Sequence, residues 1–232
     1  MSKHRIVFFD SGDTLLRPIG TGWWPKPRTT ELITDAGLPA PDEARLHAAL
    51  AAGEPFLARR QVMPSIDEEL ATYVGFYKVV LARLFEEFPA GLPHALAEAA
   101  VFEMDQEPFE DTVPALERLA SSDVRMGVIS NAGPSLELRH RDLGLRRYFD
   151  PFVISAVVRC KKPGRRIYQH ALETAGLAPE DVVFVDDLVE NVETATDLGM
   201  TCYVIDRDGA ARAAHDLPSI VDLAELVDVI GP

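Results

Sequence analysis

Apolar and polar positions follow two different patterns along the chain. An apolar run over residues 6–9 ends on Asp10, and from residue 108 onward short apolar runs alternate with helical periodicity. The predicted strands cover residues 125–130, 152–155, 182–186 and 201–205, and the predicted helices cover 113–120, 135–143, 166–175, 189–198 and 223–229. This alternation predicts an α/β fold, with a Rossmann-like, doubly wound parallel sheet core formed by residues 1–16 and 108–232.

Residues 17–107 carry a helical pattern without a convincing strand. A hinge rich in Pro and Gly over residues 17–27 comes first, and helical periodicity follows over 29–37, 42–60, 66–88 and 93–104. Pro39, Pro64 and Pro89 separate these stretches, as expected for a residue that interrupts helices. The pattern predicts an all-helical cap domain over residues 17–107, inserted directly behind the first strand.

Composition and charge exclude several classes of protein. The 232 residues are enough for one α/β core with a large insertion, and 37 acidic against 23 basic residues give a formal net charge of −14. A chain this acidic lacks the clustered basic surface of a nucleic-acid-binding protein. Cys160 and Cys202 have no metal-ligand spacing, and no signal core or membrane span is visible. We therefore expect a cytoplasmic protein that binds neither nucleic acid nor membrane.

Polar residues follow three of the predicted strands at the point where each strand ends. Asp10 follows the first strand, Ser130 and Asn131 follow the second, and Asp186 and Asp187 follow a third. Because ligands bind outside the carboxyl ends of parallel strands, these residues are candidates for a site that holds a metal ion and a phosphate. Taken singly, the acidic pair is better explained as an ordinary helix cap, and the alternative for the Ser-Asn pair is a plain turn between strand and helix.

A lysine completes this set, and the whole set resembles the haloacid dehalogenase superfamily. Four motifs carry the resemblance: residues 10–15 as nucleophile loop, the Ser130 hydroxyl, Lys162 before Pro163, and Asp186-Asp187 with Asn191. Lys161 is the alternative for the third motif. The predicted cap matches the subgroup with a helical insertion behind the first motif. The resemblance implies a hydrolase in which Asp10 attacks phosphorus or carbon and water later releases the covalent intermediate.

The resemblance also implies a role for each matching residue. Mg²⁺ is the expected cofactor, held by Asp10, the Gly12 carbonyl and Asp187, with Asp186 sharing the ion or lying behind it. Lys162, Ser130 and Asn131 are expected to bind the substrate, while Asn191, Asp13 and Thr14 support the loops. The expected substrate is a small phosphorylated metabolite, and the expected assembly is a monomer or homodimer.

Gly12 departs from the family pattern. Family phosphatases carry a second aspartate two residues after the nucleophile, where it acts as general acid and base, and glycine cannot transfer a proton. Asp13 either substitutes for it or, as we prefer, is structural. The absence of the second aspartate is also consistent with three alternatives: a 2-haloacid dehalogenase, a phosphonate hydrolase that uses the cap lysine Lys78, and a degenerate member that binds a phosphorylated ligand without turnover. The paired acids favour a metal-dependent phosphatase, slowed by the missing acid.

Aromatic and histidine side chains add two further expectations. Trp23 and Trp24 lie in the hinge, where they would form a wall for the substrate or pack between core and cap. Four of the six histidines are scattered along the chain without evident partners, so we interpret them as surface or helix-end residues: His94, His140, His170 and His215.

Overall fold

The structure is a computed structural model that describes residues 5–20, 22–122, 124–207 and 215–231. The chain divides into two compact units. Unit 1 comprises Met1–Arg17, Glu107–Ala132 and His140–Pro232, and unit 2 comprises Pro18–Gln106 and Gly133–Arg139. The sequence assigned residues 17–107 to the cap, whereas unit 2 also takes in residues 133–139, which the sequence assigned to the core.

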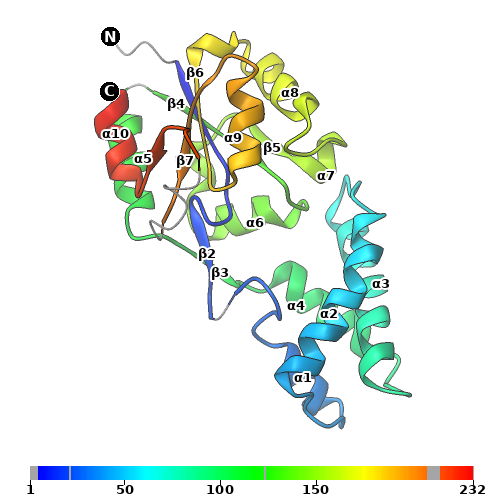
Figure 1. The fold of residues 1–232 in the computed structure, drawn as a ribbon. Helices are drawn as coiled ribbons and strands as arrows, with labels where there is room; N and C mark the ends of the chain where they lie inside the picture. Colours follow the sequence, from blue (N-terminus) through cyan, green and yellow to red (C-terminus); the bar gives the residue numbers. More distant parts are fainter. Residues whose placement is uncertain (1–4, 21, 123, 208–214, 232) are drawn as a thin grey trace. The chain divides into compact units, whose positions relative to one another are not determined.

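Unit 1 contains a parallel six-stranded sheet, as the alternating pattern predicted (Figure 1). Its order is β5 (Phe152–Ile154), β4 (Arg125–Ser130), β1 (Ile6–Phe9), β6 (Val182–Asp186), β7 (Thr201–Ile205) and β8 (Ser219–Ile220). Ile6 pairs with Arg125 on one side and with Val182 on the other, and Phe9 pairs with Val128 and Val185. Because all strands run the same way, the residues after β1, β4 and β6 meet at one edge of the sheet.

Helices cover both faces of this sheet, which explains why β1 is apolar at every position. Val7 and Phe9 pack in one cluster with residues of α5 (Thr112–Ser121) and α10 (Leu223–Ile230). Ile6 and Phe8 pack in the opposite cluster with α8 (Arg165–Ala175) and α9 (Val189–Thr196). Successive side chains of a strand point to opposite faces, so a strand buried on both faces shows no polar alternation. The doubly wound α/β fold is thereby confirmed.

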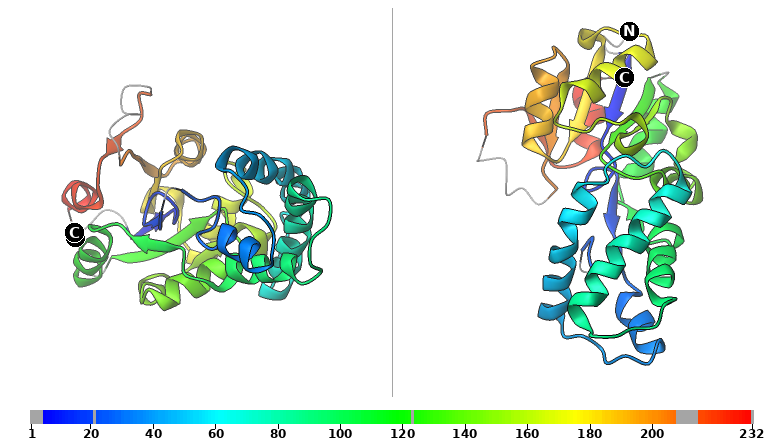
Figure 2. Two further views of the ribbon diagram at one scale, coloured as in Figure 1. Left: turned by 90° about the horizontal axis from the view of Figure 1, so that it is seen from below. Right: turned by 90° about the vertical axis from the view of Figure 1, so that its right-hand side faces the viewer.

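Unit 2 is built from α1 (Thr29–Asp35), α2 (Glu43–Ala58), α3 (Ile66–Leu84) and α4 (Leu92–Phe102). The right-hand view of Figure 2 shows α3 alongside α2 and α4, and these helices share one apolar cluster. α3 begins at a Ser65 cap, whose side chain accepts a hydrogen bond from the Glu68 N–H. It ends at Leu84, four residues earlier than predicted, because Phe85 takes an extended conformation. Trp24 packs on Phe76 of α3, with ring centroids 5.3 Å apart.

A buried network of charges lies within unit 2. The Asp105 carboxylate pairs with Lys26 and, at 3.0 Å, with Nε of Arg139. Arg139 also donates to Ser135 Oγ. The backbone N–H and the hydroxyl of Ser135 in turn donate to the Glu69 carboxylate, each at 2.7 Å. Burial raises the pKa of Asp105, but Lys26 and Arg139 outweigh burial and hold it below its usual range. Lys26 and Arg139 thus favour the ionised form of Asp105 inside the unit, and the bonds from Ser135 to Glu69 tie residues 133–139 to α3.

Several short elements were not predicted. β2 (Leu16–Pro18) and β3 (Gln106–Pro108) pair as a two-stranded sheet at the two ends of the helical insertion. The structure also forms the two-residue strand β8, the four-residue helix α7 (Ser155–Val158), and the 3₁₀ turns η1 (Arg146–Tyr148) and η2 (Pro179–Asp181). Elements this short contain too few positions for a periodic pattern. Within the described residues, no helix combines the length and apolar character needed to cross a bilayer.

Candidate functional site

Lys162 lies between two carboxylates at the carboxyl edge of the sheet in unit 1. Its Nζ is 2.7 Å from Asp10 Oδ1 and 2.6 Å from Asp186 Oδ2, and its side chain is 1 % exposed. Burial alone would lower the pKa of the ammonium group, but Asp10 and Asp186 outweigh burial and raise it. Lys161 is exposed, so Lys162 is the lysine that reaches the acidic residues.

A third carboxylate, that of Asp187, completes a cluster of acids around this lysine. One oxygen atom from each of Asp10, Asp186 and Asp187 lies within 4.8 Å of the other two. Burial, then the charges of Asp10 and Asp186, raise the pKa of Asp187 to about 7. Burial and Asp10 likewise raise the pKa of Asp186. Three carboxyl groups face one ammonium group, so their fully ionised forms would carry an excess of negative charge, and their oxygen donors fit a hard divalent cation that would offset it.

Hydrogen bonds fix the loop that carries the two adjacent aspartates. Asp186 Oδ1 accepts from the Leu188 N–H and from Asn191 Nδ2, both at 2.9 Å. Asn191 is itself held, because the Tyr168 hydroxyl donates to its carbonyl at 2.9 Å. Asn191 therefore supports the acidic loop through Asp186. Tyr168, which the sequence did not single out, supports it from α8.

Ser130 and Asn131 end β4 beside the lysine loop. Ser130 is the last residue of the strand and is buried. The Asn131 amide donates to the Lys162 carbonyl and accepts from the Lys162 N–H, both at 2.9 Å. The sequence predicted that Asn131 would bind substrate, whereas in this structure its side-chain nitrogen and oxygen both bond the backbone that presents Lys162.

The loop after Asp10 is a tight turn. The Asp10 N–H donates to the Val185 carbonyl at 2.9 Å, and the Ser11 carbonyl accepts from the N–H groups of Leu15 and Leu16. Asp13 has a φ of 53°, a left-handed conformation that Asp tolerates better than most residues. Its N–H donates to the Leu16 carbonyl at 2.8 Å. The backbone conformation and hydrogen bond of Asp13 therefore stabilise this turn.

Arg207 supports the same turn from the end of β7. Its Nη2 donates to the Thr14 carbonyl at 2.5 Å, and its Nη1 lies 2.8 and 2.7 Å from the two carboxylate oxygens of Asp111. Thr14 is fully buried, and its hydroxyl has no hydrogen-bond partner among the described residues. The sequence missed Arg207 because it lies about 190 residues from the loop it contacts, and no local pattern connects the two.

His140 corrects one expectation from the sequence. We interpreted it as a surface or helix-end residue, but it is fully buried, and its Nε2 lies 2.8 Å from Ser11 Oγ. Burial, with a smaller contribution from Arg146, lowers the pKa of His140 to about 3, so the ring is neutral at ordinary pH. A lone histidine in a helical pattern gives no sign of a partner that lies 129 residues away.

The cap residues singled out in the sequence lie in unit 2. Trp24 packs against Tyr73, Phe76 and Tyr77, whereas Trp23 is half-buried. A substrate-binding role for Trp23 stays a prediction. Lys78 is exposed on α3, whereas a Schiff-base lysine needs a desolvated pocket, so the exposure of Lys78 does not support that role.

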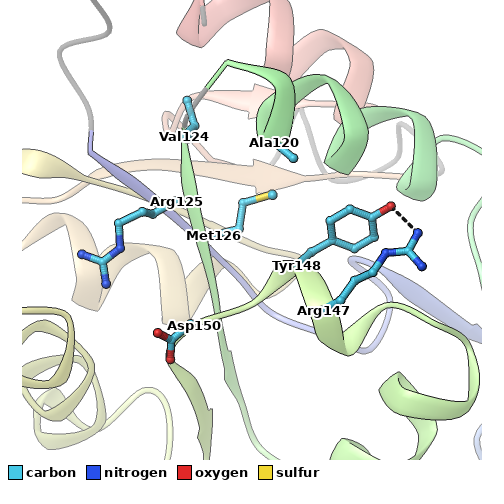
Figure 3. Close-up of a pocket in the computed structure, with 7 residues that line it drawn as sticks. All are labelled: Ala120, Val124, Arg125, Met126, Arg147, Tyr148 and Asp150. Atoms are coloured by element: carbon cyan, nitrogen blue, oxygen red, sulfur yellow. Dashed lines mark hydrogen bonds between the residues drawn. The ribbon is translucent and has the colours of Figure 1, made fainter.

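Unit 1 contains a pocket of about 400 Å³, and Figure 3 shows the side chains that line it. It is lined at the start of β4 by Arg125 and Met126, together with Arg147 and Tyr148 of η1. Arg125 pairs with Ile6 at the first position of β1, whereas Asp10 follows the last position of that strand. The pocket is therefore at the opposite edge of the sheet and takes no part in the candidate site.

Comparison with known proteins identifies relatives over the whole chain. The glyceraldehyde 3-phosphate phosphatase of Methanothermobacter thermautotrophicus is 29 % identical, over 97 % of this chain and 99 % of the relative. An (S)-2-haloacid dehalogenase of Pseudomonas fluorescens is 28 % identical over 51 % of this chain and 54 % of that protein. The crystal structure of an HAD phosphatase from Thermococcus onnurineus matches with a TM-score of 0.65 and 26 % identity, covering 98 % of each chain.

A family model decides the assignment. The model of haloacid dehalogenase-like hydrolases matches residues 4–199, which include every strand-end residue of the acidic cluster and the lysine beside it. With this match and the parallel sheet, the chain belongs to the haloacid dehalogenase-like hydrolase family and is a hydrolase.

Proposed function

We propose that this hydrolase is a Mg²⁺-dependent phosphatase that acts on a small phosphorylated metabolite through an aspartyl-phosphate intermediate. The observation that carries the proposal is the cluster of Asp10, Asp186 and Asp187 around the buried Lys162. An excess of buried carboxylates is costly without a cation, and a dehalogenase reaction has no need of one. The activity named for the Methanothermobacter relative, a phosphatase of a three-carbon phosphate ester, also supports this class of substrate.

The side chains support a two-step reaction. A carboxylate oxygen of Asp10 forms a bond to phosphorus while the bond from phosphorus to the leaving alcohol oxygen breaks, and that oxygen takes up a proton from solvent water. Water then attacks phosphorus, and inorganic phosphate leaves as the Asp10 carboxylate is regenerated. Lys162 stabilises charge on the transferring phosphoryl group, and the Ser130 hydroxyl binds one of its oxygens.

Mg²⁺ fits this donor set. Asp10, the Gly12 carbonyl and Asp187 would hold the ion, with Asp186 sharing it or orienting the other ligands. When bound, the ion supplies the positive charge that offsets repulsion between the Asp10 carboxylate and a dianionic phosphate. Asp13 remains a backbone turn residue in this scheme, and Thr14 supports the loop from its buried position.

The substrate and the metal are tested together. We expect the purified protein to release phosphate from an aryl phosphate or a three-carbon phosphate ester in Mg²⁺, and to lose this activity in EDTA because the carboxylates then repel the anion. Excess Mg²⁺ should restore it. Halide release from a 2-haloacid in EDTA, without phosphate release in Mg²⁺, would instead support the dehalogenase alternative that the absent acid at Gly12 leaves open.

A substitution at Gly12 tests whether the missing general acid limits the rate of hydrolysis. Gly12 is not one of the described glycines with a positive φ. Gly12→Asp is expected to raise kcat for a substrate with a poor leaving group, by up to about 10²-fold, because a general acid then protonates the departing oxygen. Steady-state kinetics with alkyl and aryl phosphates measure the effect.

Gly12→Asn is the matched control, since it has the same shape and cannot transfer the proton. Equal rates for the Asp and Asn variants would show that proton transfer by residue 12 does not limit the reaction. An increase confined to Gly12→Asp would locate the limitation at this position.

A further inference from the structure

Ser11 occupies an unusual place for a hydroxyl group. It directly follows Asp10, and it is fully buried in unit 1. Its carbonyl closes the turn by accepting from Leu15 and Leu16, while its side chain points to His140, with Oγ 2.8 Å from Nε2. The backbone and the side chain of Ser11 are therefore held by different groups, one local and one distant.

His140 lies in aromatic surroundings that would suit an apolar side chain. Its ring packs edge-to-face on Phe149 and on Phe152, with centroid distances of 5.6 and 5.0 Å. Among the described residues, Nδ1 has no hydrogen-bond partner, so the Ser11 hydroxyl is the polar group that the structure pairs with this ring. Burying a polar imidazole here costs free energy that a phenylalanine would not cost. The bond to Ser11 offsets part of that cost.

The pair does not have access to a substrate. Both residues have no exposed surface, so Ser11 is not a second nucleophile and His140 is not a general base for one. Any effect on the reaction has to pass through the backbone of the turn. That backbone leads directly into Asp10, whose own N–H is fixed on Val185 of β6 at 2.9 Å.

We propose that His140 is a positioning residue that orients the nucleophile Asp10 by holding the side chain of Ser11. This inference rests on the proposed function, because it assigns a role relative to attack by Asp10. The His140 bond restricts the rotation of Ser11 and, with it, the peptide that joins Ser11 to Asp10. An error of about 1 Å in the position of a reacting atom costs about 10²-fold in rate, so a small displacement of this peptide is enough to matter.

Two substitutions test the proposal, because each removes one partner of the hydrogen bond between His140 and Ser11. Separate measurement of kcat and KM distinguishes an effect on the reaction from an effect on substrate binding. His140→Phe keeps an aromatic ring in the core, and Ser11→Ala removes only the hydroxyl. Each is expected to lower kcat by about 10-fold or more while KM stays nearly constant, since the position of the nucleophile affects attack more than binding. The double variant is expected to be no slower than the slower single variant, because both substitutions remove the same bond.

Phe152→Leu is the matched structural control. It disturbs the same aromatic core and touches His140, but it leaves the bond between His140 and Ser11 in place. It is expected to lower Tm without changing kcat. The proposal is overturned if His140→Phe retains the kcat of the wild type, if the two single effects multiply in the double variant, or if Phe152→Leu lowers kcat as much as His140→Phe does.

A second measurement separates this inference from the proposed function. If the wild-type protein hydrolyses none of the phosphate esters, the proposed function fails, and crystal structures of the wild type and of His140→Phe then decide the inference. A displaced Asp10 carboxylate in the variant supports a positioning role for His140. An Asp10 carboxylate in the same place in both structures overturns it.

Discussion

Asp10→Asn is expected to lower kcat for an aryl phosphate by at least about 10³-fold, because an amide oxygen does not form the covalent intermediate. The substitution preserves shape, and Lys162 keeps its second partner, Asp186, at 2.6 Å. Steady-state kinetics in saturating Mg²⁺ measure the loss. Mass spectrometry after an acid quench gives a second readout: the peptide containing Asp10 should carry a phosphoryl group in the wild type and none in the variant.

The control is Asp142→Asn, which changes an exposed carboxylate in unit 1 by the same chemistry. It is expected to keep wild-type turnover. A rate near that of the wild type for Asp10→Asn would rule out attack by this carboxylate, and the acidic cluster would then have to act by binding the metal alone.

Asp105→Ala is expected to lower the free energy of unfolding of unit 2 by about 3 to 5 kcal/mol, because it leaves two buried cations without their shared partner. Arg139 would retain Ser135 Oγ and the Ala100 carbonyl, whereas burial already lowers the pKa of Lys26 even with Asp105 present. Urea unfolding followed by tryptophan fluorescence measures the change, since both tryptophans of the chain, Trp23 and Trp24, lie in unit 2.

Glu103→Ala is the comparison within the same unit. Glu103 pairs with Arg28 at 2.5 Å, but both side chains are substantially exposed, so water solvates the charge that remains. Glu103→Ala is expected to change the free energy of unfolding little. Equal effects of the two substitutions would mean that Asp105 contributes no more than a surface carboxylate, and the buried network would lose its assigned role in holding residues 133–139.

The sequence predicted five of the six strands of the sheet, because each of these five has a clear beginning and end, and it missed the two-residue strand β8. The uninterrupted apolar run at Val7 and Phe8 indicated a strand buried on both faces, and the carboxylates after it and after Val185 indicated the edge where they meet. That inference needed no knowledge of strand order, since parallel strands end on the same side. The sequence therefore anticipated the proximity of Asp10, Asp186, Asp187 and Lys162, which the structure brings together.

The contacts that escaped sequence analysis depend on side chains that meet only after folding. In the sequence, Glu69 resembles any acidic residue in the first turn of a helix. Its hydrogen-bond partner Ser135 lies 66 residues away along the chain. Gly133 shows how tight that contact is, because a Cβ there would lie 2.1 Å from Glu69 Oε1. His140 and Arg207 escaped for the same reason. A pattern of hydrophobic positions describes which face of an element is buried and leaves its distant polar partners unspecified.

Lys162 also differs from its neighbours in chemical reactivity. An amine acts as a nucleophile toward acylating reagents only when it is unprotonated and accessible, and Lys162 is neither, being enclosed with two carboxylates that favour its protonated form. Lys161, one residue earlier, and Lys78 on α3 are exposed. Acetylation of the folded protein would therefore modify the outer lysines and spare the one in the acidic cluster.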